Sequence, residues 1–333
     1  KKFNELNFPI INFVIVNLYP IEEMQKIKSN KKKYLEMIDI GGPTLLRSAA
    51  KNYQSVTAIC DVNDYKILIN NLKKNNGKTS LNFRKKMAAK VFDVTSTYDF
   101  IISKLMHYKK NSTLKIYNHE KKLLRYGENP HQRAFYYKNS FKNSLFDKNI
   151  LQGKHLSYNN ILDIDSAYDC ICEFNEPTCV IIKHNNPCGV ASASKIENAF
   201  LNAYSTDKTS AFGGVIALNR VVNEKLSSYI TSNFFEIIIA PKFTNIAKKI
   251  LQNKKKLILI ETNKASKNNK LYIKSVNNGY LIQQKNTIIF SKKYMKCVTK
   301  KKAIKKNIED LVFSFKVCKH VKSNAIVLVN NKK

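Results

Sequence analysis

The order of apolar segments in the first third of the chain is the feature that most limits the fold. Asn12–Asn17 predicts a buried strand, which ends at Leu18-Tyr19-Pro20. Gly41-Gly42-Pro43 then opens a predicted helix, and Val56–Asp61 predicts a second strand. A long helix is expected over Leu81–Leu105. This β-α-β order favours an α/β domain.

The rest of the chain repeats the alternation after a polar, basic stretch, His107–Lys122. We place a domain boundary in that stretch, which gives domains of residues 1–118 and 119–333. A chain of 333 residues is long enough for two such cores. Five strands and two helices make the second domain α/β as well. The strands are expected at Cys179–Lys183, Gly214–Leu218, Glu236–Ala240, Leu257–Glu261 and Ala325–Val329, and the helices at Asp163–Phe174 and Ile308–Val317.

The formal net charge of +34 suggests nucleic acid as a partner. Only five of the 58 basic residues are Arg, however, and the Lys residues are scattered among Asn and Ile. A phosphate-binding stripe would be clustered and would usually contain Arg. We attribute the charge to a chain-wide bias and expect no specific nucleic-acid partner. A basic RNA-binding protein remains the alternative function from another class.

Other broad classes are disfavoured by simple counts. No apolar run reaches the roughly 18 residues that span a bilayer, and no secretory signal is visible, so we expect a cytoplasmic protein without a membrane partner. The seven Cys residues are odd in number and form no CxxC pair, which argues against a disulfide framework and a structural zinc site. Buried free thiols are expected.

Glycine and arginine are both scarce, so the places where they occur are informative. Arg is expected where a planar, bidentate fork is needed, and Gly where the backbone takes positive φ or is approached closely. Eight of the nine glycines lie in short segments that we expect to be structurally demanding: Gly41-Gly42, Gly127, Gly153, Gly189, Gly213-Gly214 and Gly279.

The loop before the first predicted helix is a candidate anion site. Gly42 and Thr44 stand at the helix start, where free N–H groups and the positive end of the helix dipole attract anions. Arg47 and Lys51 lie one helical turn apart, so both can face the same bound group. The alternative is a plain turn in which Asp39 only caps the helix.

A second polar loop runs from Arg125 to His131. It brings a guanidinium, a phenol, a carboxylate and an imidazole together around a turn, and its Asn-Pro pair disfavours helix. Arg125, with Tyr126 and Gly127 beside it, suits phosphate recognition. A polar surface turn is the alternative.

The strongest candidate centre is Lys183-His184-Asn185-Asn186-Pro187-Cys188-Gly189, which follows an apolar strand and is expected to end it with a Pro/Gly turn. Chemistry on open α/β sheets gathers where strands end. His184 is suited to proton transfer, and Lys183 can stabilise a developing oxyanion or hold the imidazole neutral. Pro187-Cys188 resembles a zinc deaminase signature, but Ala191 replaces its second Cys and Asn186 stands where Glu is required, so zinc is disfavoured. A strand-end turn is the alternative.

One more turn, Thr209–Gly214, precedes a predicted strand. Small residues and Gly213 permit close approach of a ligand, and Phe212 can stack on a ring. Taken singly, the segment favours an ordinary turn over a ligand site.

In this order, the segments resemble the bifunctional AICAR transformylase/IMP cyclohydrolase family over nearly the whole chain. Each motif alone is weak, but the ordered set is specific. The matching stretches are Asn17–Pro20, Ile38–Arg47, Ala49–Asn52, Arg125–His131, Leu156–Asn160, Lys183–Val190, Thr209–Gly214 and Lys319–Ala325.

The resemblance implies an incomplete N-terminal cyclohydrolase domain similar to methylglyoxal synthase, then an incomplete transformylase domain related to the cytidine deaminase fold without zinc. The family's transformylase moves a formyl group from 10-formyltetrahydrofolate, its cosubstrate, to the 5-amino group of AICAR. Its cyclohydrolase closes formyl-AICAR to IMP by dehydration. A homodimer with shared transformylase sites is also implied.

Residue roles follow from the same resemblance. His184 resembles the general base on the amine, and Lys183 would polarise the formyl carbonyl or tune His184. Arg125 and Tyr126 would hold the phosphate and ribose region of AICAR, with Gly127, Asn186, Phe212 and Gly213 nearby. In the cyclohydrolase half, Tyr19, Asp39 and Lys51 match residues that position the formyl group and move protons.

The chain departs from the family at both ends. It begins after the family's first strand, loop and helix, and it stops at Lys333 before a part that includes folate-site residues and a catalytic Asn. We therefore expect a fragment; if the protein ends at Lys333, transformylase activity should be absent or severely impaired. A non-catalytic remnant of the enzyme is the second alternative function.

Overall fold

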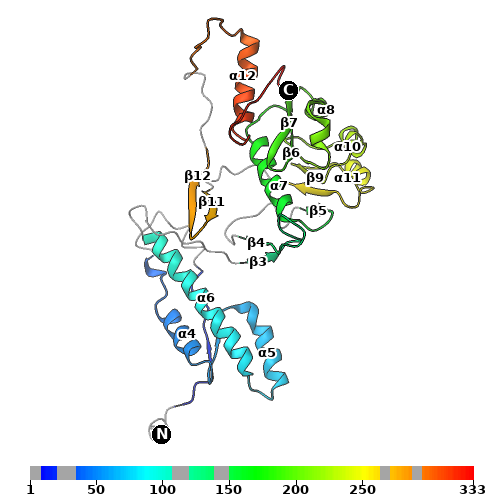
Figure 1. Cartoon of the computed structure of the whole chain (residues 1–333). Coiled ribbons are helices and arrows are strands. Elements are labelled where there is room, and N and C mark those ends of the chain that lie inside the picture. Colours follow the sequence, from blue (N-terminus) through cyan, green and yellow to red (C-terminus); the bar gives the residue numbers. More distant parts are fainter. Residues whose placement is uncertain (1–8, 21–34, 107–119, 139–149, 263–270, 287–294) are drawn as a thin grey trace. The chain divides into compact units, whose positions relative to one another are not determined.

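The computed structural model describes residues 9–20, 35–106, 120–138, 150–262, 271–286 and 295–333. The chain divides into two compact units, residues 1–117 and 118–333 (Figure 1). The predicted boundary between residues 118 and 119 lies outside the described residues. Each unit is described by itself.

The N-terminal unit contains a parallel pair of strands joined by a helix. β1 pairs with β2 in parallel, so α4 forms the crossover between them. The predicted helices at Gly41 and at Leu81 and the predicted strand after Val56 are confirmed. The elements are β1 (Phe13–Ile15), α4 (Gly41–Lys51), β2 (Thr57–Ile59), η1 (Val62–Asp64), α5 (Tyr65–Lys74) and α6 (Leu81–Met106).

The prediction of a buried strand over Asn12–Asn17 is only partly right. β1 has three residues, and its Phe13 and Ile15 side chains are 39% and 48% exposed. Val14 and Val16 face the other way and pack on the cluster of α4, β2 and α6. Because side chains alternate across a strand, only one face of β1 is covered by the described residues.

The C-terminal unit is built on a six-stranded sheet. Its strand order is β5-β10-β9-β8-β6-β7, with β8, β9 and β10 parallel to one another and β6 antiparallel to β8. The strands of this sheet are β5 (Ile150–Gln152), β6 (Thr178–Lys183), β7 (Asn186–Ser192), β8 (Val215–Leu218), β9 (Ile237–Ala240) and β10 (Ile258–Glu261).

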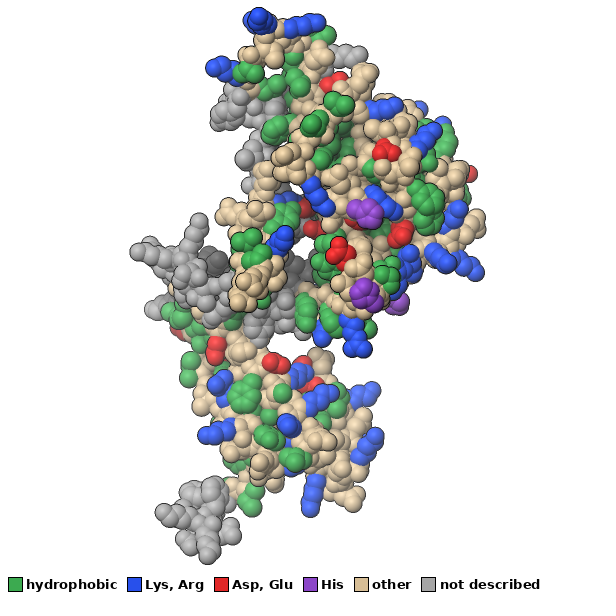
Figure 2. Space-filling model, viewed as in Figure 1, with side chains coloured by type: hydrophobic (Ala, Val, Ile, Leu, Met, Phe, Trp, Pro, Cys, Tyr) green, Lys and Arg blue, Asp and Glu red, His purple; other side chains and the backbone are tan. Residues whose placement is uncertain are grey.

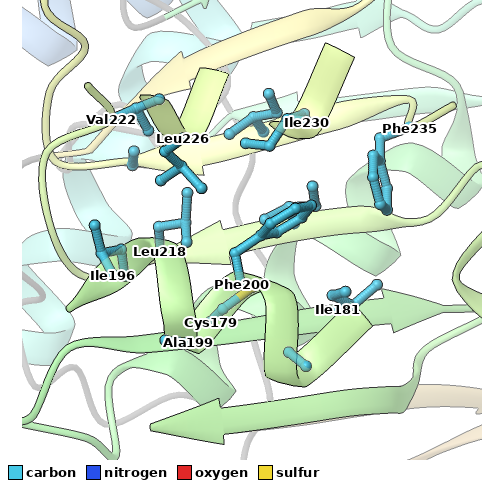
Figure 3. Close-up of a cluster of buried hydrophobic side chains, with 14 of the residues drawn as sticks. Cys179, Ile181, Ile196, Ala199, Phe200, Leu218, Val222, Leu226, Ile230 and Phe235 are labelled. Atoms are coloured by element: carbon cyan, nitrogen blue, oxygen red, sulfur yellow. The ribbon is translucent and has the colours of Figure 1, made fainter. Parts of the chain in front are cut away.

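Helices cover both faces of this sheet (Figure 1). One face packs on α8, α10 and α11, and the cluster around Phe200 fills that layer (Figure 3). The other face packs on α7 and α12. These helices are α7 (Tyr158–Ile171), α8 (Ile196–Thr206), α9 (Lys208–Ala211), α10 (Glu224–Thr231), α11 (Asn245–Leu251) and α12 (Lys305–Cys318).

The mixed α/β class is thus confirmed, and β6, β8, β9 and β10 lie within a residue of their predicted positions. The predicted strand Ala325–Val329 is wrong, because the segment pairs with no strand among the residues that the structure describes. Val327 and Val329 pack on the core, whereas Ile326 and Leu328 are 84% and 90% exposed. The segment therefore has the alternation of a strand without a paired neighbour.

Two hairpins were not predicted. Both consist of antiparallel pairs, and the second turns at Asn277, which has positive φ, just before Asn278-Gly279. An Asn-Gly pair between apolar runs is a hairpin signal that was available in the sequence. The strands are β3 (Glu120–Leu123), β4 (Phe135–Lys138), β11 (Leu271–Val276) and β12 (Gly279–Gln284).

Surface and thiol properties complete the description. In the part of the chain that the structure describes, no helix has both the length and the hydropathy of a membrane span. All seven Cys residues are free, but only Cys60, Cys170 and Cys179 are buried, so the expectation of buried thiols holds for three. Figure 2 shows Lys and Arg side chains spread over the visible face of each unit.

Candidate functional site

The candidate residues of the C-terminal unit gather at one end of the strands of the six-stranded sheet. Ile182, near the end of β6, pairs with Val215 at the start of β8, and Val215 pairs with Ile237 at the start of β9. The site therefore lies where β6 ends and where β8 and β9 begin. The expectation that it lies where strands end holds for β6 alone, because β6 runs antiparallel to β8.

The centre of the site is a two-residue hairpin between β6 and β7. His184 and Asn185 form its turn, with φ of +53° and +61°. The predicted Pro/Gly turn is wrong, since Pro187 and Gly189 lie within β7. Pro187 is tolerated there because β7 is the edge strand of the sheet and its register with β6 shifts beside Ile182.

Helix α7 holds the hairpin turn from one side. The Asp163 carboxylate accepts a hydrogen bond from the Asn185 N–H at 2.6 Å, and the Ser166 hydroxyl donates to Asn185 Oδ1 at 3.0 Å. The segment after α12 approaches as well: Lys322 Nζ donates to the His184 carbonyl at 3.2 Å, and the Lys322 N–H donates to Asn186 Oδ1 at 3.2 Å. The His184 side chain itself is exposed.

The structure joins Lys183 to the turn after α9. Lys183 Nζ donates to the carbonyl oxygens of Phe212 and Gly213 at 3.0 and 3.1 Å. Gly213 has φ of +68°, and a Cβ there would lie 3.0 Å from Lys183 Nζ. This turn thus requires glycine. The Phe212 ring is exposed and lies 5.0 Å from the Phe234 ring, measured between centroids.

The Arg125 loop is attached to the start of the same helix α7. The Tyr158 N–H donates to the Tyr126 carbonyl at 3.1 Å, and Asn159 Nδ2 donates to the Glu128 carbonyl at 3.1 Å. Arg125 is exposed and packs over the ring of Tyr126, donating to its hydroxyl at 2.8 Å. The Gly127 N–H donates to the Gln132 carbonyl and closes the turn.

Three residues of this region were missed in the sequence: Asp163, Glu236 and Lys322. Glu236 stands just before β9, where its carboxylate accepts from Asn160 Nδ2 at 3.0 Å and lies 3.6 Å from Lys154 Nζ. A signal for Asp163 existed. Asn159, Asp163 and Ser166 fall at positions i, i+4 and i+7, which share one face of a helix.

In the candidate anion site of the N-terminal unit, several donors are already hydrogen-bonded within the protein. Asp39 Oδ1 accepts from the Gly42 N–H at 2.7 Å, and the Thr44 hydroxyl donates to the Ile40 carbonyl at 2.8 Å. This geometry favours the alternative in which Asp39 caps the helix. The Asp39 N–H also donates to the Tyr98 hydroxyl at 2.8 Å, a partner that the sequence did not suggest.

The remaining residues of that half are exposed. Arg47 Nη1 lies 3.4 Å from Thr95 Oγ1, and its guanidinium lies 5.5 Å from the Phe92 ring centroid. Lys51 ends α4, and Tyr19 is exposed beyond β1. Among the described residues, no three His, Cys, Asp or Glu side chains gather as metal ligands would.

The segment after α12, which includes Lys319, His320 and Lys322, is anchored by Glu173, just beyond the C-terminal end of α7. Lys319 Nζ lies 2.7 Å from Glu173 Oε1, and His320 Nε2 lies 3.5 Å from the same oxygen. The neighbouring His320 and Lys319 lower the pKa of Glu173 from its usual value of 4.5 to about 2. A lowered folded-state pKa stabilises the fold above the unfolded pKa, and this contribution is lost as the pH falls towards 2.

We therefore expect Glu173→Gln to reduce the stability of the chain at pH 5–6 and to lose less stability than the wild type on acidification towards pH 2. Urea unfolding midpoints between pH 2 and 6 measure both effects. Glu224→Gln, on the exposed start of α10, is the matched control and should follow the wild type. Parallel curves for Glu173→Gln and wild type would contradict the assignment.

Comparison with known proteins gives a consistent result. A family model described as AICARFT/IMPCHase bienzyme matches residues 49–333. The bifunctional purine biosynthesis protein PurH of Caldicellulosiruptor saccharolyticus is 43% identical over 100% of this chain and 66% of its own length. The PurH proteins of Caldicellulosiruptor bescii and Aquifex aeolicus are 44% and 43% identical over 97% and 96% of this chain.

The chain thus spans 64–66% of the length of these three relatives. Among solved structures, the crystal structure of ForH matches 32% of this chain and 56% of its own, with 28% identity. Its TM-score of 0.27 is too low to bear on the fold.

Proposed function

We infer the function from the premise that this chain belongs to the AICARFT/IMPCHase bienzyme family. We propose that it serves purine biosynthesis by formyl transfer from 10-formyltetrahydrofolate to AICAR and by dehydrative closure of formyl-AICAR to IMP. The observation that carries the proposal is the contact of Lys183, the residue before His184, with the Phe212-Gly213 turn at one end of the strands. An RNA-binding role is not favoured.

The two units divide the work in this proposal. Residues 1–118 would be the C-terminal part of a methylglyoxal-synthase-like cyclohydrolase domain, and its parallel β1 and β2 joined by α4 support this. Residues 119–333 would be the N-terminal part of a cytidine-deaminase-like transformylase domain. The sheet covered by helices on both faces supports that assignment.

In the transformylase step, the AICAR amine nitrogen attacks the formyl carbon of the folate. His184 accepts the proton that the amine loses, for which its exposed position at the turn leaves the imidazole accessible. Lys183 has three N–H donors, and two point to the carbonyls of Phe212 and Gly213. The third can stabilise the oxyanion on the formyl oxygen. As the oxyanion re-forms the carbonyl, the C–N10 bond breaks, N10 takes the proton that His184 accepted, and tetrahydrofolate leaves with His184 neutral again.

Substrate binding is assigned to groups at the same end of the strands, of which Arg125 and Phe212 are exposed. Arg125, held against Tyr126, would bind the AICAR phosphate, and Gly127 lets the loop turn tightly. Asn186, Phe212 and Gly213 would contact the base and ribose, with the exposed Phe212 ring available for stacking.

In the cyclohydrolase half, Tyr19, Asp39 and Lys51 would position the formyl group and move protons, while Gly42, Thr44 and Arg47 would hold the phosphate. Asp39 and Gly42 already bond to each other, so Lys51 and Arg47 are the groups best placed to meet a ligand. We further propose a cytoplasmic homodimer that needs 10-formyltetrahydrofolate as cosubstrate and no zinc.

Ligand-dependent thermal unfolding tests the proposal. We expect AICAR to raise the melting temperature of the chain in a saturable way, because a ligand that binds only the folded state stabilises it. Arg125→Ala should weaken this effect at least tenfold. Arg220→Ala should not, because Arg220 follows the C-terminal end of β8, whereas the site lies at the start of β8. Stabilisation by random RNA at low salt, with no effect of AICAR, would support the RNA-binding alternative instead.

A further inference from the structure

The hairpin turn at the site has a backbone conformation that its residues do not favour. His184 and Asn185 both have positive φ, at +53° and +61°. Two-residue turns of this kind are usually Asn-Gly or Gly-Gly, because a Cβ costs roughly 1–2 kcal/mol in the left-handed region. His and Asn enter that region more readily than most residues, but neither enters it freely. Contacts outside the turn must therefore stabilise it.

Asp163 supplies the shortest of these contacts. Its Oδ1 accepts the Asn185 N–H at 2.6 Å, Ser166 holds the Asn185 side chain, and Lys322 holds the His184 carbonyl from the other side. All three bonds engage the backbone of the turn or the side chain of Asn185. The His184 imidazole takes part in none of the three, so it stays available while its backbone is held.

Asp163 occupies this position at a cost to the fold. Burial raises the pKa of Asp163, and the Asn185 N–H, the charge and N–H of His184 and the charge of Lys183 offset this only partly. A carboxyl group whose pKa is raised by folding destabilises the folded state when it is charged, at pH values above that pKa. Global stability is therefore a poor explanation for a charged group here, and a local task at the site is a better one.

We propose that Asp163 is a positioning residue, whose carboxylate holds the His184–Asn185 turn in the left-handed conformation and thereby aims the His184 imidazole. The inference rests on the proposed function in that His184 acts as the base of formyl transfer. The hold itself is a property of the chain and can be measured without turnover. Asp163 is a positioning residue here because it acts through the turn and touches no reacting atom.

NMR of the 333-residue chain tests whether Asp163 keeps the His184–Asn185 turn in the left-handed conformation, which we call the hold. The Cα and Cβ chemical shifts of His184 and Asn185 report their φ, and we expect left-handed values in the wild type. Asp163→Ala should shift both residues away from these values while the urea midpoint stays equal or rises. Asp163→Asn keeps an acceptor oxygen and should retain them. Glu224→Ala, on the exposed start of α10, is the control for loss of a carboxylate.

A second variant separates the hold from simple loss of structure. In Asp163→Ala/Asn185→Gly the turn should re-form, since glycine takes positive φ without cost, and the His184 shifts should return to the wild-type values. Retention of the wild-type shifts in folded Asp163→Ala would overturn the proposal. Global unfolding of that variant would overturn it too, because Asp163 would then be a structural residue.

Kinetics provide the functional readout. The kinetic test uses a full-length version of the protein, which includes the family's C-terminal part. Because a misplaced base slows the chemical step, we expect Asp163→Ala to lower its kcat for formyl transfer about tenfold and to leave KM for AICAR within about twofold. The double variant should recover most of kcat. If the shifts move as expected and formyl transfer is unaffected, the hold is real and the role of His184 as base is wrong, so the two proposals fail separately.

Discussion

In a full-length version of the protein, His184→Ala is expected to lower the rate of formyl transfer from 10-formyltetrahydrofolate to AICAR by about 10²–10⁴-fold, the usual contribution of a positioned general base. The imidazole is exposed at the hairpin turn beside Lys183. Of the groups that we assign to substrate binding, only Asn186 lies on the same hairpin, and the others lie on the Arg125 loop and the Phe212-Gly213 turn. AICAR affinity should therefore change little. Single-turnover formation of formyl-AICAR and thermal shift by AICAR measure the two quantities.

His184→Asn is the matched control for the backbone. Alanine at a residue with φ of +53° strains the turn, whereas asparagine tolerates the left-handed region and cannot accept the amine proton. We expect the two variants to be equally slow, with His184→Asn the more stable of the two. Near-normal formyl transfer in His184→Asn would exclude the imidazole as the base.

Gly189→Ala is expected to destabilise the C-terminal unit by about 2–3 kcal/mol, at the upper end for one added methyl group in a packed interior. A Cβ at Gly189 in β7 would collide with the backbone carbonyl oxygen of Ala203 in α8. A backbone atom of a helix cannot rotate away as a side chain can. The change should shift the urea midpoint, since the strand and helix must move apart.

Gly279→Ala is the control for this substitution. Gly279 opens β12, and the nearest atom to its added Cβ is the Val276 carbonyl oxygen at 4.0 Å. We expect a change within about 0.5 kcal/mol, as for most open surface positions. Equal midpoints for the two variants would show that β7 and α8 accommodate the methyl group and that their close approach is not required.

The sequence was sufficient wherever local pattern decides the structure. Continuous apolar runs correctly placed β6, β8, β9 and β10, and the glycine and proline at its start correctly placed α4. The hydrophobic effect acts on these segments largely whatever their neighbours are, so periodicity is enough to find them. Lys183, Phe212 and Gly213 were all named as candidates from the sequence. Their contact was not predicted, because it depends on the order of the strands in the sheet.

Long-range pairing accounts for most of what was missed. Pro187-Cys188-Gly189 predicts a turn from its local sequence. In the structure this segment instead pairs with β6 as part of β7, and the turn lies at His184-Asn185. Ala325–Val329 has the alternation of a strand and lacks a partner in the described residues. The hold of Asp163 on Asn185 joins residues 22 apart in the chain, which periodicity cannot reveal.

The scarcity of glycine was a useful guide with definite limits. Gly42, Gly127, Gly153, Gly189, Gly213 and Gly214 each have atoms where a Cβ would stand, as expected. Gly41 and Gly279 have none within contact distance, so the expectation is wrong for them. Gly77, which was not singled out, takes φ of +80°. The close approaches depend on tertiary packing, which glycine content alone does not encode.

Helix α7 sets the spacing and direction of the side chains that contact the two loops of the site. Asn159 touches the Arg125 loop, and Asp163 and Ser166 touch the hairpin turn, all from one face of the helix. Each residue turns an α-helix by about 100°. One residue inserted or deleted between Asn159 and Asp163 would therefore point Asn159 away from the Arg125 loop or Asp163 and Ser166 away from the hairpin turn. Between Asn159 and Asp163, the site should therefore tolerate substitutions better than insertions or deletions.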